Sequence, residues 1–428
     1  MATKMKSSGI AWIGEIPKGW GIKKITHLFN IIGSGTTPLS SNPDYYNGEI
    51  NWVNTGDLND GVLYSTERKI TEVALADYST LKQFKEGSLI IAMYGATIGK
   101  VSILGIKAAT NQACCVLSDP VGVITKYVYY WFISNRDNVI SLALGGGQPN
   151  ISQDLIRSLR IPIPGEKEQR AIINYLDQKC GDIDKVISAK QRQNELLKEQ
   201  RQSIIYEAVT KGLNKNVKYK DSGIEWIGEI PEDWEICKIK YICDIDKNRL
   251  PENTDENFLF NYIDISSVTE LGGIGDTIRM SFKESPSRAR MVVSENDIII
   301  STVRTYLRAI AFITENDKYI CSTGFAVLTP KENLNSKFAF YQVQSEYIVQ
   351  EIVRRSVGVS YPAITATALS NISLIIPPLS IQRVIADYLD QKCAAVDRII
   401  NANNDMIEKL QEYRQSIVYE AVTGKIDI

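Results

Sequence analysis

The chain has 428 residues and a formal net charge of −2. Hydrophobic cores stop growing at roughly 250–300 residues, so we expect at least two globular units. The charge balance disfavours a protein that coats nucleic acid non-specifically, because such proteins are basic overall, but it allows a local basic face. No run of about eighteen apolar residues occurs, and no apolar stretch follows the first positive charges. We therefore expect a cytoplasmic protein without a membrane segment.

Histidine and cysteine usage argues against catalysis. His27 is the single histidine, whereas Ser/His/Asp triads, Cys/His pairs and histidine-rich metal sites all need an imidazole with partners. The seven cysteines contain no C-x-x-C pair, so neither a zinc site nor a disulfide framework is indicated. We expect a chain that is not an enzyme and that holds no metal and no cofactor of its own.

An internal repeat determines the organisation of the chain. The first block, SGIAWIGEIP at residues 8–17, returns at residues 222–231 as SGIEWIGEIP. A second block, with QR followed by YLDQKC, ends at residue 180 and returns ending at residue 393. The segments between the blocks share pattern more than residues. The protein is therefore expected to alternate two variable segments with two constant ones.

The variable segments look mixed α/β and rich in short strands. Residues 88–94 and 297–303 are apolar runs typical of buried strands. Residues 127–132 and 337–341 are aromatic runs typical of packed helices, and we expect long loops after them.

Three polar loops of the first variable segment are candidates for DNA contact. Residues 33–38, 109–112 and 145–150 combine flexible backbone with hydroxyl and amide side chains. Amides can read adenine edges with two hydrogen bonds, and hydroxyls hold phosphates. The candidate side chains, with a lysine that ends a glycine turn, are Thr36, Thr37, Asn111, Gln112, Gln148 and Lys100. Each loop taken alone is explained as well by an ordinary polar surface loop.

Three short patterns in the same segment resemble enzyme motifs. Residues 95–100 are one residue short of a phosphate-binding loop and lead into Val101, which has no hydroxyl for magnesium, so a glycine turn between two strands is the better interpretation. Asn-Pro-Asp-Tyr at residues 42–45 resembles a loop of amino-methyltransferases, but no glycine-rich turn for a methyl donor accompanies it. Asp44 with Glu67 and Lys69 fits the loose spacing of a metal-dependent nuclease, which stays open as the enzyme alternative.

Each constant segment predicts a long helix that begins just after a proline-containing stop. Apolar residues then recur at three- and four-residue steps and predict a seam for a partner helix. Lys190 and Asn403 occupy this seam as polar residues of the kind that fixes register. The predicted seam consists of Ile183, Val186, Ile187, Lys190, Leu197 and Ile204 in the first helix and of Val396, Ile399, Ile400, Asn403, Leu410 and Ile417 in the second.

The two helices are expected to pair with each other. A helix of about forty residues is some 60 Å long at roughly 1.5 Å per residue and would overhang a single domain. The predicted fold class is therefore α+β, with mixed α/β domains at residues 1–162 and 214–376. Two long helices, at residues 163–213 and 377–428, join them and are expected to pair as a coiled coil in a pseudo-two-fold repeat. A helix that covers its own domain is the alternative.

The second variable segment is more basic than the first. Arginine reads guanine O6 and N7 with two hydrogen bonds and also binds phosphate. The candidates for DNA contact here are Arg288, Arg290, Arg304 and Arg308, with Ser360 and Tyr361 near the end of the segment. A solvated face interleaved with acidic residues such as Glu284 and Glu295 explains any single one of them as well.

The repeated blocks, together with GTTP at residues 35–38, GATIGKV at 95–101 and TNQ at 110–112, resemble the specificity subunits of type I restriction-modification systems. The likeness covers nearly the whole chain. One departure is Ile381, which stands where the first copy keeps Glu168 in the block before the helix. It puts a charge contact at that position in doubt, but not the helix.

The resemblance implies two target-recognition domains, each reading one half of a split, asymmetric site in double-stranded DNA. It also implies that the two helices pack as an antiparallel coiled coil and act as a spacer, onto which two methyltransferase subunits and two motor/nuclease subunits dock. S-adenosylmethionine, ATP and Mg²⁺ would then belong to those partner subunits, and this chain would contribute no catalytic residue.

Overall fold

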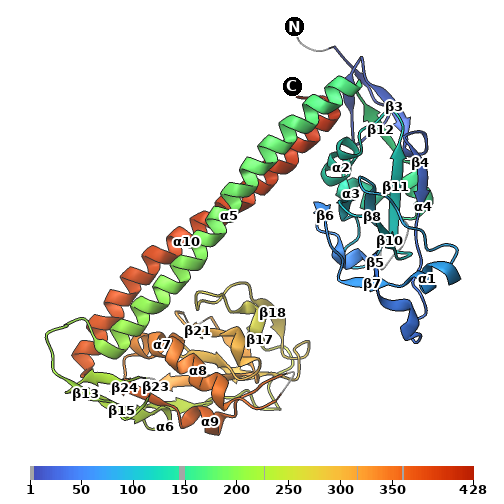
Figure 1. Cartoon of the computed structure of the whole chain (residues 1–428). Coiled ribbons are helices and arrows are strands. Elements are labelled where there is room, and N and C mark those ends of the chain that lie inside the picture. Colours follow the sequence, from blue (N-terminus) through green and yellow to red (C-terminus); the bar gives the residue numbers. More distant parts are fainter. Residues whose placement is uncertain (1–3, 144–149, 226, 316, 359–360) are drawn as a thin grey trace. The chain divides into compact units, whose positions relative to one another are not determined.

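The computed structural model describes residues 4–143, 150–225, 227–315, 317–358 and 361–428. The chain divides into two compact units, each with a piece of both long helices (Figure 1). Unit 1 comprises residues 1–189 and 405–428, and unit 2 comprises residues 190–404. Mixed α/β units and two long helices confirm the predicted fold class. The sequence-based division into two domains and two helical segments follows the type of segment, whereas the two units are defined by compactness. That division stays a prediction.

Unit 1 contains a five-stranded sheet of order β4-β11-β8-β9-β6 and a three-stranded sheet of order β10-β5-β7. Its elements are β1 (Met5–Ser7), β2 (Glu15–Pro17), β3 (Gly21–Lys24), β4 (Phe29–Gly33), β5 (Tyr46–Val53), β6 (Val62–Leu63), β7 (Arg68–Ile70), α1 (Glu72–Asp77), β8 (Leu89–Ala92), β9 (Val101–Leu104), β10 (Ala108–Thr110), β11 (Cys114–Pro120), α2 (Thr125–Ser134), α3 (Arg136–Ser141), α4 (Gln153–Ser158) and β12 (Arg160–Ile163).

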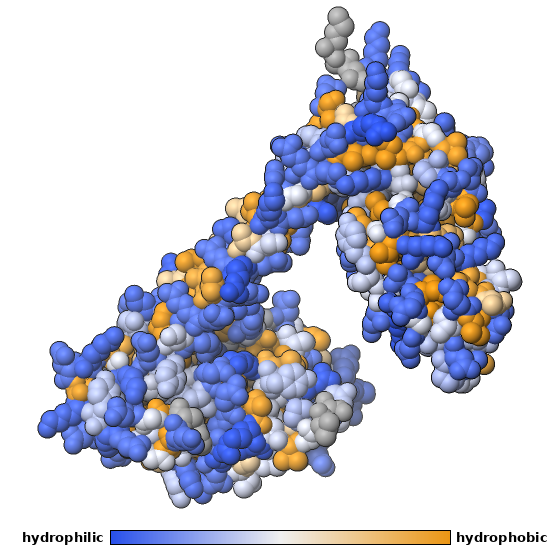
Figure 2. Space-filling model, viewed as in Figure 1, coloured by the Kyte–Doolittle hydropathy of each residue, from blue (hydrophilic) through white to orange (hydrophobic). Residues whose placement is uncertain are grey.

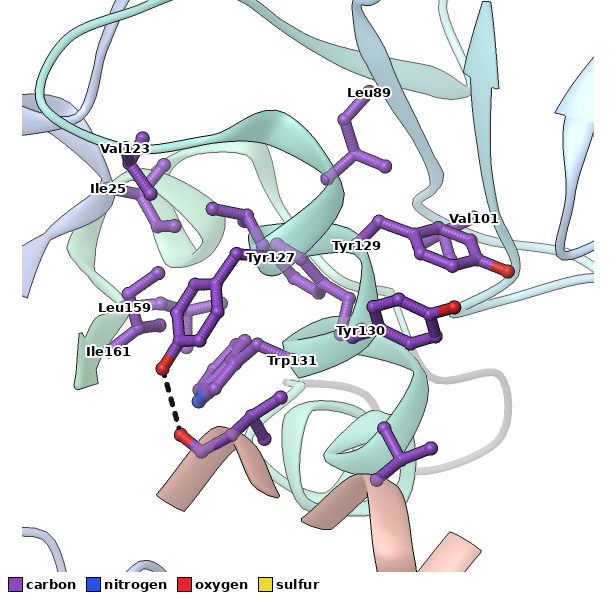
Figure 3. Packing of buried hydrophobic residues seen from close by; sticks show 14 of the residues in the cluster. Ile25, Leu89, Val101, Val123, Tyr127, Tyr129, Tyr130, Trp131, Leu159 and Ile161 are labelled. Atoms are coloured by element: carbon purple, nitrogen blue, oxygen red, sulfur yellow. Dashed lines mark hydrogen bonds between the residues drawn. The ribbon is translucent and has the colours of Figure 1, made fainter. Parts of the chain in front are cut away.

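The core of unit 1 forms around helix α2, whose aromatic residues are buried on several sides (Figure 3). Tyr127 and Trp131 are fully buried there, between the sheet and the end of the second long helix. The Tyr127 hydroxyl donates to the carbonyls of Pro162 and Val422, at 2.9 Å each. Burial raises the pKa of Tyr127 well above its usual value, so the hydroxyl keeps its proton and acts as a donor.

Unit 2 repeats the arrangement with sheets of order β16-β23-β20-β21 and β18-β17-β22-β19. Its elements are β13 (Tyr219–Asp221), β14 (Glu229–Pro231), β15 (Glu235–Lys238), α6 (Ile239–Ile242), β16 (Cys243–Ile245), β17 (Leu259–Ile263), β18 (Ile278–Ser281), β19 (Ala289–Val292), β20 (Ile298–Ser301), β21 (Ile310–Phe312), β22 (Tyr319–Ser322), β23 (Phe325–Pro330), α7 (Ser336–Gln344), α8 (Glu346–Arg355), α9 (Ala366–Ser370) and β24 (Ser373–Ile376).

The two units share most of their sheet topology. The antiparallel series β4-β11-β8-β9 matches β16-β23-β20-β21, and the parallel pair β10 and β5 matches β22 and β17. The buried runs predicted as strands are β8 and β20, and those predicted as packed helices fall in α2 and α7. Long loops directly after these helices were a wrong expectation, since α3 and α8 follow them. Helix α8 forms because its apolar residues are spaced to bury one face.

The repeated first blocks form equivalent hairpins, β1 with β2 and β13 with β14. Trp20 and Trp234, which follow them, are each 3% exposed, whereas Trp226 lies outside the described residues. The Trp20 indole N–H donates to Glu168 Oε1 at 2.8 Å. In the second half Ile381 stands in place of that glutamate, and its aliphatic side chain cannot accept the equivalent hydrogen bond from an indole.

The long helices are α5 (Glu166–Lys211) and α10 (Leu379–Thr423), of 46 and 45 residues. Both begin just after a strand and a proline-containing stop, β12 with Pro164 and β24 with Pro377 and Pro378. Their buried and half-buried positions alternate by three and four residues, the spacing of a heptad seam. These positions are 173, 176, 180, 183, 187, 190, 194, 197 and 201 in α5, and 389, 393, 396, 400, 403, 407, 410, 414 and 417 in α10.

Two of the predicted seam residues depart from this strip. Val186 and Ile399 are each 45% exposed, because each lies one residue before a seam position. One residue turns a side chain by about 100° around the helix axis, which moves it to the flank. The other predicted seam residues lie on the strip, with half-buried Ile204 at its C-terminal end in α5.

Within unit 2 the two helix segments run antiparallel and meet in a polar layer. Lys190 Nζ donates to Asn403 Oδ1 at 3.0 Å, and the Asn403 amide donates to Asn194 Oδ1 at 2.8 Å. Further along α5, Arg201 forms an ion pair with Asp397 at 2.9 Å. Rising numbers on α5 pair with falling numbers on α10, so these contacts set one register.

Replacing Arg201 by alanine should destabilise unit 2 markedly. Arg201 is 6% exposed and Asp397 21% exposed, and the arginine also donates to the Leu271 carbonyl at 3.2 Å. Burial raises the pKa of the Asp397 carboxyl, and the guanidinium opposes that rise. Removing one partner of a buried pair costs roughly 3–5 kcal/mol, and partial exposure of Asp397 favours the lower end. Native-state hydrogen exchange of the α5 and α10 amides measures this change.

The matched control is Arg170→Ala on the same helix. Its ion pair with Glu166 is 66% and 69% exposed, and such surface pairs contribute about 0–1 kcal/mol. Equal losses of stability for the two variants would contradict a buried ion pair as a stabilising element of unit 2.

Candidate nucleic-acid interface

In unit 1 two of the three predicted polar loops, at residues 33–38 and 109–112, meet at the ends of β4 and β10. Thr37 Oγ1 donates to Gln112 Oε1 at 2.6 Å, although the two residues are 75 positions apart. Asn111 Nδ2 donates to Asn54 Oδ1 at 3.2 Å, and Asn111 Oδ1 accepts from the Ala113 N–H at 3.0 Å. Thr37 and Gln112 are exposed, whereas Asn111 is half-buried. The cluster therefore presents hydroxyl and amide groups to solvent on a braced loop.

Gly35 makes this approach of the two loops possible. Its backbone N–H donates to Thr110 Oγ1 at 3.0 Å. A Cβ at Gly35 would lie 1.7 Å from the Thr110 carbonyl oxygen, a separation that no side chain can adopt. Half-buried Thr36 follows and accepts from the Trp52 indole through its carbonyl oxygen at 3.3 Å. The backbone of Thr36 is therefore held by Trp52.

Lys100 ends the glycine turn between β8 and β9, as expected from the sequence. The turn closes on itself, since the Ile98 N–H donates to the Gly95 carbonyl and the Lys100 N–H to that of Thr97, at 3.2 Å and 3.0 Å. Gly99 has a φ of +75° and packs closely against Arg136. Lys100 itself is half-buried. Gln148, the remaining candidate of this half, lies outside the described residues.

In unit 2 two of the four candidate arginines lie in the turn between β20 and β21. The Arg304 guanidinium lies over the Tyr361 ring, 4.7 Å from its centroid. Arg308 binds both oxygens of Glu346, at 2.7 Å and 3.0 Å. Its hydrogen bonds lower the pKa of the Glu346 carboxyl. Ser360 lies outside the described residues.

Of the other two candidate arginines, Arg288 precedes β19 and Arg290 lies within it, and their environments differ. Arg288 is exposed, and its carbonyl accepts from the Thr323 N–H at 2.8 Å, which ties this segment to the loop after β22. Arg290 lies over the Phe282 ring at 4.6 Å and donates to the Ala289 carbonyl at 2.9 Å. Arg288 is therefore the more accessible of this pair.

The residues of the nuclease alternative have other partners. Lys69 forms an ion pair with Glu49 at 3.5 Å, and the Glu67 N–H donates to Asp57 at 3.0 Å. Within the described ranges, no group of three or more His, Cys, Asp or Glu side chains could hold a metal ion. The seven cysteines are free, and burial raises the pKa of Cys115 to about 12, which keeps that thiol protonated.

Sequence reasoning missed three residues that lie beside the candidate side chains. Asn54, which braces Asn111, follows β5 directly, and an amide at a strand end was the available signal. Tyr306 and Leu307, beside Arg304, are 52% and 49% exposed. No pattern in the sequence distinguishes their exposed side chains from core residues.

The face of the molecule drawn in Figure 2 is largely polar. On the face drawn in Figure 2, hydrophilic residues predominate on both units, and hydrophobic residues form small separate groups. None of the described helices is long and apolar enough to cross a membrane.

Comparison with known proteins agrees with this geometry. The family described as the type I restriction modification DNA specificity domain matches residues 17–199 and 231–409. The specificity subunit of type I restriction enzyme MjaIX from Methanocaldococcus jannaschii is 25% identical, over 97% of this chain and 95% of its own length. The MjaVIII specificity subunit of the same organism is 22% identical, over 97% and 94%. In fold, a solved chain of a type I R-M system matches with a TM-score of 0.70 at 17% identity, over 96% of this chain and 99% of that one.

Repeated mixed α/β units that gather amides, hydroxyls and arginines at strand ends fit the class of sequence-reading DNA-binding proteins. The chain belongs to the type I restriction-modification DNA specificity family. It is a DNA sequence-recognition subunit, and catalysis in these systems resides in other subunits.

Proposed function

We propose that the chain reads a bipartite, asymmetric site in double-stranded DNA, with one half-site for each unit. The observation that carries this proposal is the structural repeat. Equivalent strands in the two units end in loops with different chemistry, amides and hydroxyls in unit 1 and arginines in unit 2. Equivalent scaffolds with different side chains favour two separate base sequences, because base edges are read by side chains in the grooves.

In this proposal α5 and α10 form an antiparallel coiled coil that sets the spacing between the half-sites. The heptad spacing of their buried positions and the Lys190–Asn403–Asn194 layer support it. Because each helix contributes to both units, lengthening the helices should lengthen the unspecified DNA between the half-sites.

The proposed complex is cytoplasmic and contains two methyltransferase subunits and two motor/nuclease subunits. S-adenosylmethionine, ATP and Mg²⁺ would bind to these partners, so this chain would supply sequence recognition and docking surfaces alone. Its net charge of −2 is compatible with this division of labour if the partners provide much of the phosphate contact.

The experiment that tests the proposal is genome-wide mapping of methylated adenine after co-expression with the cognate methyltransferase subunit. One motif of two specified parts, separated by a fixed number of unspecified base pairs, is the expected result. Absence of any split motif, together with magnesium-dependent cutting by the isolated chain, would overturn it in favour of the nuclease built on Asp44, Glu67 and Lys69.

Replacing Gln112 by alanine should relax only the half-site that unit 1 reads. Gln112 is exposed and held by Thr37, and a bidentate amide contact contributes roughly 1–3 kcal/mol of base discrimination. Asn111→Ala should act on the same half-site by loosening the loop, since its amide already bonds to Asn54 and Ala113. Equilibrium binding to duplexes mutated in one half-site at a time measures both effects. Equal effects on both half-sites would contradict independent units.

A further inference from the structure

We infer that Arg304 reads a guanine in the half-site of unit 2, and that Arg308 is a positioning residue that holds the turn carrying it. This inference rests on the proposed function, because it names the base that one unit recognises. The two arginines lie four residues apart and are of the same residue type, but the inference gives them different roles.

The turn that carries Arg304 is fastened to its surroundings on both sides. The Arg304 N–H donates to the Pro362 carbonyl at 2.8 Å, and the Ile364 N–H donates to the Thr302 carbonyl at 2.9 Å. The buried Thr305 hydroxyl lies 2.8 Å from that of Ser356. The backbone beneath Arg304 is therefore defined before any ligand binds, which reduces the ordering cost of binding.

Both arginines have left-handed backbone conformations, with φ of 49° at Arg304 and 55° at Arg308. A non-glycine residue in this region costs about 1–2 kcal/mol. Such conformations cluster at functional sites, where the surrounding structure over-determines them. Two of them frame the short 3-10 turn Thr305–Leu307, so the two arginine side chains leave the turn at its opposite ends.

Arg304 has the environment of a base-reading arginine. It is exposed and its guanidinium lies over Tyr361, which is 65% exposed. Contact with an aromatic face restrains the planar group while its N–H donors stay in the guanidinium plane. A planar fork of donors matches guanine O6 and N7, the commonest specific arginine contact in the major groove. Exposed Tyr306 and Leu307 beside it supply apolar contact area.

Arg308 has a different environment, because a carboxylate of the protein already accepts hydrogen bonds from its guanidinium group. Glu346 binds two of its nitrogens and is itself held by the Gln350 amide at 2.7 Å. Glu346 lies in the first turn of α8, where a negative charge is favoured by the helix dipole. This bidentate pair anchors the end of the turn to α8, so Arg308 acts on DNA through the position of Arg304.

The test uses the complex with the methyltransferase subunit and the motif that it methylates. Arg304→Lys keeps the positive charge but removes the planar set of N–H donors. Arg304→Asn removes the charge and the planar donors, and asparagine can adopt the left-handed backbone conformation of this position. Both variants should lose preference for a guanine at one position of the unit 2 half-site, by roughly 5- to 150-fold. The unit 1 half-site should stay unchanged, which shows that the complex is intact.

A duplex with 7-deazaguanine at that position provides the atomic test, because it lacks the N7 acceptor. The native complex should bind it at least about fivefold more weakly, and the Arg304→Asn complex should bind both duplexes equally. Arg308→Lys should retain the guanine preference and lose less affinity than Arg308→Gln, since lysine can still pair with Glu346.

The outcomes separate this inference from the proposed function. A split motif whose unit 2 half-site contains no guanine overturns the inference and leaves bipartite recognition standing. The same holds if Arg304→Asn remains sensitive to 7-deazaguanine, or if Arg308→Lys loses the guanine preference. Absence of any split motif overturns the proposed function, and the inference with it.

Discussion

Replacing Gly35 by alanine should abolish recognition of the half-site read by unit 1 while leaving recognition by unit 2 intact. The added Cβ would lie 1.7 Å from the Thr110 carbonyl oxygen and 2.6 Å from its carbon. These are backbone atoms of β10, so the strain cannot be relieved by rotating a side chain. The two loops must separate, which breaks the Thr37–Gln112 hydrogen bond and moves the polar side chains out of register.

Displacement of catalytic or recognition groups by about 1 Å commonly costs on the order of 100-fold, and we expect a loss of at least this size in affinity for cognate DNA. Competition binding with duplexes altered in either half-site measures it. Gly21→Ala is the matched control, because nothing lies within 4 Å of a Cβ at that position. If the Gly35 variant lost recognition of both half-sites while unit 2 unfolded as it does in the native protein, the two units would not read their half-sites independently.

Inserting four residues after Leu197 should lengthen the spacer of the recognised DNA by one or two base pairs. Four helical residues add about 6 Å along the axis, against a rise of roughly 3.4 Å per base pair. The sequences of both half-sites should stay the same, because neither interface is altered. Mapping methylation by the complex containing the insertion mutant measures the spacing directly.

A second insertion of four residues after Ile400 in α10 is the matched control for register. Leu197 lies between the bonded pairs Asn194–Asn404 and Arg201–Asp397, so a single insertion shifts one side of the seam against the other. The single insertion should therefore lose affinity, and the paired insertion should recover it at the longer spacing. An active mutant with unchanged spacing would require the coiled-coil spacer to be withdrawn.

The elements with local periodicity could be predicted from the sequence. The two long helices follow from apolar residues at steps of three and four, and the buried strands β8 and β20 follow from short apolar runs between turns. The error at Val186 and Ile399 arises because two adjacent apolar residues both fit a mean period of about 3.6. Contact with the partner helix decides which of the two residues is buried, and no local pattern in the sequence indicates that contact.

The contacts that assemble the interface could not be predicted in this way. Thr37 and Gln112 are both plausible polar loop residues, but their hydrogen bond joins positions 75 apart and depends on the parallel pairing of β10 with β5. Arg304 and Arg308 look equivalent in the sequence. Glu346, 38 residues beyond Arg308, and Tyr361 separate their roles through tertiary contacts.

Mapping of methylated adenine with Gln112→Ala, Arg304→Lys and the double variant tests the central claim most directly, namely that each unit reads one half of the site. We expect Gln112→Ala to relax one half-site and Arg304→Lys the other. The double variant should show both changes at unchanged spacing. The changes in DNA-binding free energy caused by the two substitutions should add to within about 0.5 kcal/mol. A single substitution that relaxes both half-sites would contradict separate reading by the two units.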